Sequence, residues 1–239
     1  MEQGSAFVAG ATGYTGREVV RALRARGIDT IAHVRADSTR QDEWRARFAS
    51  LGARTDSTPW RPEPLEALLA REQPSWVFAL LGTTQARARQ ARREGKPDSY
   101  ETVDYQLTAL LLDATKLAAP KARFLYLSSI GVNRDTRNPY LAVRARIEEE
   151  LTRSGIAWTI ARPSFITGPD RDEGRPLERV AALVSDTVLD IAAVLGAKRL
   201  RAHYASTTNR VLADTLVRLA LDDDAANRVF ESEQLRTPG

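Results

Sequence analysis

Gly10-Ala11-Thr12-Gly13-Tyr14-Thr15-Gly16 is the stretch that decides the fold of this chain. It lies between an apolar run at residues 6–9 and a segment with helical spacing at residues 17–26. Glycines in such a strand–turn–helix setting let a dinucleotide pyrophosphate approach the backbone and let the helix pack close to its strand. The helix start offers free N–H groups and a positive dipole end. The alternative is a tight turn without a ligand. The expected cofactor-binding residues here are Gly10, Thr12, Gly13, Tyr14, Thr15 and Gly16.

Strand-like and helix-like segments alternate along the first two thirds of the chain. The strand-like segments are residues 5–9, 28–34, 53–55, 75–81, 123–127 and 156–161. The helix-like segments are residues 14–26, 41–51, 62–71, 98–118 and 139–154. Such alternation with short connections predicts an α/β fold with a doubly wound parallel sheet, a Rossmann fold. Ligands of such sheets bind beyond the carboxyl ends of the strands.

The length of 239 residues fits a single NAD(P)-binding domain over residues 1–239. Residues 164–239 are less regular, and we expect them to form a small substrate-side region. Within it we expect helices at residues 177–195 and 208–221 and short strands at residues 201–205 and 228–231. The apolar spacing of residues 177–195 suits a helix over the site, a subunit interface or ordinary core packing.

Composition excludes several classes of function. The chain has no cysteine and only two histidines, which excludes thiol catalysis, disulfides and a multi-histidine metal centre. The 35 basic residues are spread among 31 acidic ones, so we expect solvated helix surfaces and no nucleic-acid partner. No apolar stretch is long enough to cross a bilayer, and no secretory signal is evident. We therefore expect a cytoplasmic protein that does not bind membranes.

The residue after the second strand-like segment indicates which dinucleotide binds. An acidic side chain there favours NAD, whereas an arginine can pair with a 2′-phosphate and favours NADP. Arg35 occupies this position and Arg40 is near, which predicts NADP(H). Asp37 keeps NAD(H) open, since its carboxylate could reach a ribose hydroxyl, and Arg35 could also be an ordinary surface arginine. His33 lies within the strand-like segment, and we expect it to be structural.

Small and hydroxyl-bearing residues follow the fourth and fifth strand-like segments. Leu81, Gly82 and Thr83 would let the backbone approach the adenine ribose, although an ordinary turn has the same composition. Ser128 and Ser129 place two hydroxyls where one could hydrogen-bond a substrate carbonyl.

Tyr140 and Arg144 open the next helix-like segment and share one helix face. A nearby cation lowers the pKa of a phenol, so such a tyrosine can donate or accept a proton near neutral pH. The alternative is an exposed pair near a helix start. Read with the two serines and the glycine stretch, the pair predicts a catalytic site.

With these motifs the chain resembles the atypical NAD(P)-binding members of the short-chain dehydrogenase/reductase superfamily. The similarity is strongest to the Tat-interacting oxidoreductase-like proteins, with NmrA-like proteins more distant. The matching segments are GATGYTG at residues 10–16, LGTT at 81–84, LSSIG at 127–131, YLAVR at 140–144, Arg162-Pro163, and DRDEGRP at 170–176.

The resemblance implies roles for individual residues. It makes Ser129 the catalytic serine, with Ser128 as the alternate, and Tyr140 the catalytic tyrosine. Arg144 stands where the superfamily has a lysine that bonds the nicotinamide ribose. Asp104 aligns with a polar position often occupied by asparagine. Residues implied to contact the cofactor, beyond the glycine stretch and Arg35, are Leu81, Gly82, Thr83, Ser128, Tyr140, Arg144, Pro163, Ser164 and Phe165.

Two functions follow from this reading. The first is an NADP(H)-dependent oxidoreductase that transfers hydride to or from a small carbonyl or quinone substrate. The second is an NmrA-like regulatory NADP(H) sensor with little or no turnover, which Arg144 and the arginine-rich residues 83–97 favour. A homodimer or a regulatory protein partner is compatible with either.

Overall fold

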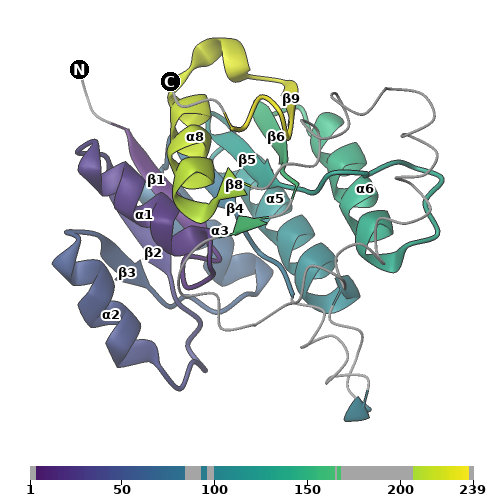
Figure 1. Ribbon diagram of the computed structural model, residues 1–239. Helices are drawn as coiled ribbons and strands as arrows, with labels where there is room; N and C mark the ends of the chain where they lie inside the picture. Colours follow the sequence, from purple (N-terminus) through teal and green to yellow (C-terminus); the bar gives the residue numbers. More distant parts are fainter. Residues whose placement is uncertain (1–3, 84–92, 96–99, 165, 168–206, 237–239) are drawn as a thin grey trace.

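The computed structural model describes residues 4–83, 93–95, 100–164, 166–167 and 207–236 (Figure 1). It contains one seven-stranded parallel sheet with the strand order β3-β2-β1-β4-β5-β6-β9. The strands are β1 (Ser5–Ala9), β2 (Asp29–His33), β3 (Arg54–Asp56), β4 (Trp76–Ala79), β5 (Arg123–Leu127), β6 (Trp158–Arg162) and β9 (Arg228–Glu231). The predicted doubly wound α/β fold is therefore confirmed, and the order of strands reverses between β1 and β4.

Helices connect the strands and cover both faces of the sheet (Figure 1). They are α1 (Gly16–Ala25), α2 (Gln41–Ser50), α3 (Pro62–Glu72), α5 (Leu107–Ala118), α6 (Pro139–Thr152) and α8 (Asn209–Leu221), with a 3₁₀ turn η2 (Asp223–Ala225). Most of these bounds agree with the sequence prediction to within two residues. No helix in the described ranges is long and apolar enough to cross a membrane.

The predicted helix at residues 98–118 differs from the structure at its start. A π-helix, η1 (Tyr100–Gln106), precedes α5, so its backbone hydrogen bonds span five residues where those of an α-helix span four. The short parallel pair of β7 (Ile166–Thr167) and β8 (Thr207–Thr208) was not predicted, because two-residue strands leave no periodicity in a sequence. The elements predicted at residues 177–195 and 201–205 lie outside the described residues.

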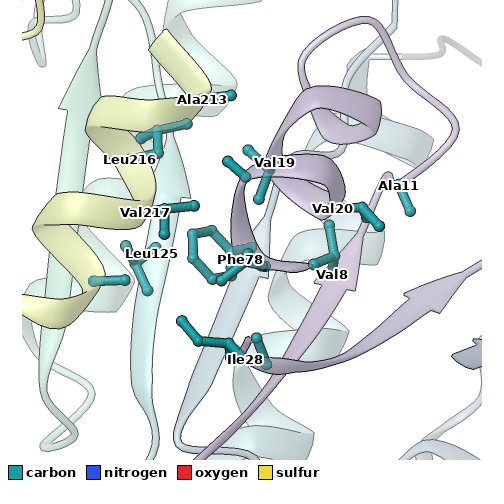
Figure 2. Close-up of a cluster of buried hydrophobic side chains, with 14 of the residues drawn as sticks. Val8, Ala11, Val19, Val20, Ile28, Phe78, Leu125, Ala213, Leu216 and Val217 are labelled. Atoms are coloured by element: carbon teal, nitrogen blue, oxygen red, sulfur yellow. The ribbon is translucent and has the colours of Figure 1, made fainter. Parts of the chain in front are cut away.

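Alternation along β1 places its side chains in two separate hydrophobic layers. Ala6 and Val8 pack toward α1, α2 and α8, whereas Phe7 and Ala9 pack toward α3, α5 and α6. Figure 2 shows the first layer, in which Phe78 of β4 lies between residues of α1 and α8. Because both faces of β1 are buried, its position in the sheet is fixed, and so is the loop that follows it.

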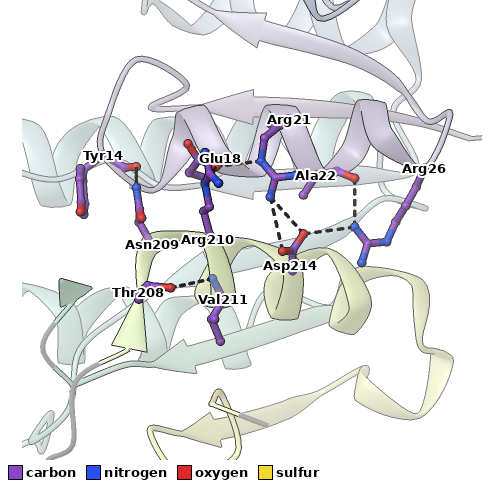
Figure 3. A network of polar contacts seen from close by, with 10 residues as sticks. All are labelled: Tyr14, Glu18, Arg21, Ala22, Arg26, Thr208, Asn209, Arg210, Val211 and Asp214. Atoms are coloured by element: carbon purple, nitrogen blue, oxygen red, sulfur yellow. Dashed lines mark hydrogen bonds and ion pairs between the residues drawn. The ribbon is translucent and has the colours of Figure 1, made fainter. Parts of the chain in front are cut away.

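The C-terminal part of the chain joins the main fold through α8 and β9. Figure 3 shows α8 lying against α1, where Asp214 pairs with Arg21 at 3.3 Å and with Arg26 at 3.5 Å. The side chain of Asn209 donates to the carbonyl oxygen of Tyr14 at 3.4 Å. These contacts hold the start of α8 against the loop that precedes α1. The assignment of residues 1–239 to a single domain with a substrate-side region stays a prediction.

Candidate active site

The glycine loop between β1 and α1 lies where the order of the strands reverses, between β1 and β4. Gly10 has φ +78°, and a Cβ there would lie 2.5 Å from the carbonyl oxygen of Leu80. A Cβ at Gly16 would lie 2.1 Å from the carbonyl oxygen of Gly10. Both distances are far below van der Waals contact with backbone that cannot move away. The protein's own packing therefore requires glycine at these two positions.

Gly13 is different, because it is exposed and a side chain there would be less crowded than at Gly10 or Gly16. Among the described residues a Cβ there would meet only the carbonyl oxygen of Gly10, at 3.1 Å. The N-cap residue of α1, Thr15, forms no side-chain capping hydrogen bond, while the N–H groups of Arg17 and Glu18 donate to the carbonyl oxygens of Gly13 and Thr15 at 3.1 Å. The positive end of the α1 dipole therefore faces the loop without a side-chain acceptor at the N-cap. Glu18 in that turn is paired with Arg21 at 2.8 Å and Arg210 at 3.4 Å. The loop thus fits a dinucleotide pyrophosphate in space and in charge.

The two basic residues after β2 differ in how firmly they are held. Arg40 forms hydrogen bonds of 2.7 and 2.5 Å with Glu43, and its guanidinium lies 5.0 Å from the centre of the Trp44 ring. Arg35 has an exposed side chain and a long contact of 3.7 Å with Asp37, which is also exposed. An exposed pair at that distance contributes little, so Arg35 can move to a new anion with little cost.

His33 is a buried structural residue, as the sequence suggested. Its Nε2–H donates to the carbonyl oxygen of Thr58 at 2.9 Å, and its ring lies edge-on to Trp60 at 5.0 Å between centroids. Burial lowers the pKa of His33 below its ordinary value, although the hydrogen bond to Thr58 opposes this shift. The imidazole is therefore held neutral beneath the end of β2.

A buried ion pair joins η1 to helix α6, and its carboxylate also holds the loop after β4. The Nη2 atom of Arg144 donates to Oδ1 of Asp104 at 3.1 Å, and the two residues are 5% and 1% exposed. Oδ2 of Asp104 accepts from the backbone N–H of Thr83 at 2.9 Å. A Cβ at Gly82 would lie 3.4 Å from Nη2 of Arg144. The structure thus brings together the predicted cofactor loop of residues 81–83 and the predicted catalytic Arg144.

The rest of the guanidinium of Arg144 also faces the protein. Nη1 donates to the carbonyl oxygen of Leu127 at 2.8 Å and to the hydroxyl of Tyr126 at 3.3 Å. Nε is buried without a hydrogen-bond partner in the described part of the chain. A buried donor without an acceptor costs about 1–3 kcal/mol, and such groups tend to occur at functional sites.

Charge and burial shift the pKa values of two groups in this cluster. Burial acts to lower the pKa of Arg144, but Tyr140, Tyr126 and Asp104 outweigh it and raise the pKa above its ordinary value. Burial raises the pKa of Tyr126, against the opposing effect of Arg144. Arg144 therefore stays a cation, and Tyr126 stays a neutral phenol.

Tyr140 lies in the first turn of α6, where Asn138 caps the helix by accepting from the N–H of Tyr140 at 3.0 Å. The guanidinium of Arg144 lies 4.5 Å from the centre of the Tyr140 ring, within the range of a cation–π contact. Tyr100 of η1 meets the same ring edge-on, with 5.5 Å between centroids. The ring is thus fixed between α6 and the π-helix, while the residue remains partly exposed.

The two serines after β5 have different environments. The hydroxyl of Ser128 is buried and donates to Oε1 of Glu148 at 2.5 Å. Glu148 also accepts two hydrogen bonds from Arg162, at 3.1 and 2.5 Å. Ser129 is half-buried, and its hydroxyl has no hydrogen bond among the described residues. Of the two hydroxyls, that of Ser129 is the one left for a ligand.

The predicted residues after β6 are described only in part. The carbonyl oxygen of Pro163 accepts from the N–H of Ile130 at 3.0 Å, which ties this segment to the one after β5. Ser164 is buried, and its N–H donates to the hydroxyl of Ser232 at 3.3 Å. Phe165 lies outside the described residues.

Sequence reasoning missed the roles of Glu148 and Tyr126 and left that of Asp104 open. Glu148 follows Arg144 by four residues and Tyr140 by eight, so helical spacing could have placed it on the same face. Tyr126 precedes the two serines, and only the pleat of β5 turns it toward α6. The contact of Asp104 with Arg144 depends on the π-helix, and no local pattern predicts it.

Comparisons with known proteins show which family and which proteins this chain resembles. A family model described as NAD(P)H-binding matches residues 10–197. The mitochondrial protein fmp52-1 of Aspergillus terreus is 29% identical over 186 residues, which cover 76% of this chain and 74% of that protein. The mitochondrial protein FMP52 of Candida glabrata is 30% identical over 174 residues, covering 72% and 68%.

Solved structures agree with the fold. A candidate NAD-dependent epimerase/dehydratase from Bacillus halodurans aligns with a TM-score of 0.67 at 15% identity, covering 98% of each chain. This likeness shows the fold, and together with the NAD(P)H-binding family model it is consistent with the resemblance to atypical NAD(P)-binding members of the short-chain dehydrogenase/reductase superfamily.

The expected cytoplasmic location is wrong. The two fungal relatives are named as mitochondrial proteins. The expectation depended on the lack of a secretory signal and of an apolar span, and neither feature distinguishes the cytoplasm from the interior of an organelle.

Proposed function

Because this chain belongs to the NAD(P)H-binding family, we propose that it is an NADP(H)-dependent oxidoreductase acting on a small carbonyl or quinone substrate. The observation that carries the proposal is that Asp104 links the loop after β4, through the N–H of Thr83, to Arg144, four residues after Tyr140. The segment proposed to hold the cofactor and the segment proposed to carry proton transfer therefore meet at one place. That place is the carboxyl edge of the sheet, beside the point between β1 and β4 where the order of the strands reverses.

The chain's own residues would divide the work as follows. Gly10, Thr12, Gly13, Tyr14, Thr15 and Gly16 would bind the pyrophosphate at the start of α1, and Arg35 the 2′-phosphate. Leu81, Gly82, Thr83, Ser128, Pro163, Ser164 and Phe165 would complete the cofactor site. A bound nicotinamide supplies hydride chemistry.

Tyr140 would donate or accept the proton at the substrate oxygen, and the hydroxyl of Ser129 would hydrogen-bond that oxygen. Arg144 would fix the Tyr140 ring through the 4.5 Å cation–π contact and help to hold the cofactor ribose. The guanidinium of Arg144 is already paired with Asp104, so the role of Arg144 differs from that of a solvated lysine.

That pairing supports a second candidate, a regulatory NADP(H) sensor with little or no turnover. A cation that is buried and bonded to a carboxylate is less available to a reacting group than a free one. A sensor would bind oxidised and reduced nucleotide with clearly different affinities and would show no Tyr140-dependent turnover.

Nucleotide titration followed by a substrate screen tests the proposal. Quenching of tryptophan fluorescence would give the Kd of NADPH and NADH, and NADPH oxidation would be followed with a panel of aldehydes, ketones and quinones. We expect NADPH to bind more tightly than NADH and at least one substrate to turn over. Tyr140→Phe should lower kcat about 10²- to 10⁴-fold with an unchanged Kd for NADPH.

Tyr105→Phe is the matched control, since Tyr105 bonds Glu150 at 2.6 Å on the outer side of the same two helical segments. It should leave kcat within about twofold of wild type. If Tyr140→Phe keeps the turnover of wild type, Tyr140 is not the proton donor. A strong preference for one redox form without turnover would favour the sensor.

A further inference from the structure

Asp104 occupies a junction between three parts of the candidate site. One carboxylate oxygen accepts from the backbone of Thr83, in the loop after β4, and the other accepts from Arg144 on α6. Asp104 itself belongs to η1, which also brings Tyr100 against the Tyr140 ring. A single carboxylate thus fixes the relative positions of the cofactor loop, the π-helix and the catalytic helix.

Arg144 is matched to this carboxylate in shape as well as in charge. Its planar fork reaches Asp104, the carbonyl oxygen of Leu127 and the hydroxyl of Tyr126 at once, while its face packs on Tyr140. A lysine ammonium is a compact charge on a flexible stem and cannot make these four contacts together. The pair is buried, so loss of either partner would leave an uncompensated charge inside the protein.

We infer that Asp104 and Arg144 form one matched, charge-neutral unit, in which Asp104 is a positioning residue that acts on Tyr140 through Arg144 and on the cofactor loop through Thr83. This inference rests on the proposed function for its effect on turnover. Its effects on folding and nucleotide binding can be measured without a substrate.

One consequence is that the superfamily's lysine, placed at position 144, should raise neither the thermal midpoint nor the affinity for NADPH. Arg144→Lys leaves Asp104 facing a cation that no longer bonds Leu127 and Tyr126 together with it. Asp104→Asn leaves the buried charge of Arg144 without its counter-ion. Arg144→Gln in turn leaves the buried charge of Asp104 unpaired. The double variant Asp104→Asn/Arg144→Gln carries neither charge, and we expect it to recover part of what Asp104→Asn and Arg144→Gln each lose.

The experiment is a double-mutant cycle on the full chain with three measurements: the thermal midpoint, the Kd for NADPH and the turnover of the best substrate found in the panel. We expect Arg144→Lys to lower the midpoint and to weaken NADPH binding about tenfold. The double variant Asp104→Asn/Arg144→Gln should bind NADPH several-fold more tightly than Asp104→Asn or Arg144→Gln alone and have a higher midpoint than either.

The control cycle uses Glu101→Gln and Arg146→Gln, an ion pair of 2.9 Å between the same two elements, η1 and α6, but exposed to solvent. Its effects should be small and additive. Additive effects in the Asp104–Arg144 cycle would overturn the inference. Coupling in the midpoint without coupling in the Kd would also overturn it, because the pair would then be structural only.

Failure of the proposed function gives a different result. If the wild type oxidises NADPH with none of the substrates in the panel, the oxidoreductase proposal fails. Coupling in both the midpoint and the Kd would still support the matched unit. If Arg144→Lys equals wild type in all three measurements, the unit does not exist, whatever the substrate screen gives.

Discussion

Gly16 lies so close to Gly10 that a Cβ at Gly16 would stand 2.1 Å from the carbonyl oxygen of Gly10. The first turn of α1 is thereby pressed against the end of β1. The glycines of this loop consequently have two separate functions. Gly10 and Gly16 are needed for the chain to fold, whereas Gly13 leaves space that the folded protein itself does not fill.

Substitutions in the loop should separate these functions. Gly16→Ala should lower the free energy of unfolding by about 3 kcal/mol, since backbone would have to move. Gly13→Val should cost less than Gly16→Ala, because its Cβ would lie 3.1 Å and not 2.1 Å from the carbonyl oxygen of Gly10, yet abolish NADPH binding by filling the pyrophosphate's space. Chemical denaturation and fluorescence titration measure the two effects. Unchanged NADPH affinity in Gly13→Val would remove the pyrophosphate assignment.

Arg35→Asp should reverse or weaken the preference for NADPH over NADH. The variant places a carboxylate where the 2′-phosphate would bind, and the side chain is exposed, so folding should be unaffected. We expect the ratio of NADPH to NADH affinity to fall at least about tenfold. Arg40→Asp is the control, because Arg40 is held by Glu43 and should change the ratio little. An unchanged ratio in Arg35→Asp would mean that another residue reads the phosphate.

Arg123 should matter for stability and not for the site. It lies at the start of β5 and donates to the carbonyl oxygens of Leu219 at 3.2 Å, Ala220 at 3.3 Å and Asp222, which end helix α8. Arg123→Met would take this donor from the carbonyl oxygens of Leu219 and Ala220, while that of Asp222 still accepts from the N–H of Ala225 at 3.1 Å. The loss should cost about 2–4 kcal/mol of unfolding free energy. Asp223→Asn removes only an exposed partner and should cost under about 0.5 kcal/mol. Equal losses in the two variants would contradict this account.

Stability should decrease in mild acid because of His33. Burial lowers the folded-state pKa of His33 below that of the unfolded chain. Stability from the neutral imidazole is therefore fully present above the unfolded pKa, about 6.5. It is lost as the pH falls from there through the folded pKa, because the unfolded chain takes up the proton first. The thermal midpoint should fall from pH 7.5 to pH 5.5. His33→Gln keeps a donor for Thr58 but cannot titrate, so its midpoint should change less; an equal change would assign the effect to other groups.

The sequence was sufficient for the sheet because its signals are local. A strand buried on both faces, such as residues 75–81, reads as a continuous apolar run, and a helix that covers the sheet shows its own period. The glycine stretch also carries its meaning within seven residues. The candidate pair of Tyr140 and Arg144 was predictable for the same reason, since both residues lie on one helix face.

The sequence was not sufficient for the environment of that pair. Asp104 meets Arg144 across 40 positions of chain, and their contact depends on the π-helix that shifts the register ahead of α5. Which of Ser128 and Ser129 keeps a hydroxyl for a ligand was decided by Glu148, which bonds the first of them. These are contacts between elements, and no periodicity within one element encodes them.

What the sequence alone determined is therefore the parallel sheet, the glycine loop after its first strand, and the helix that carries Tyr140. Each follows from short-range patterns of apolar residues, glycines and helix spacing. What only the tertiary structure decided is that Arg144 is a buried ion-pair partner and not a solvated cation. The charge of Arg144 is local, but its surroundings are set by packing between η1, β5 and α6, because the free energy of a charge depends on what replaces its water.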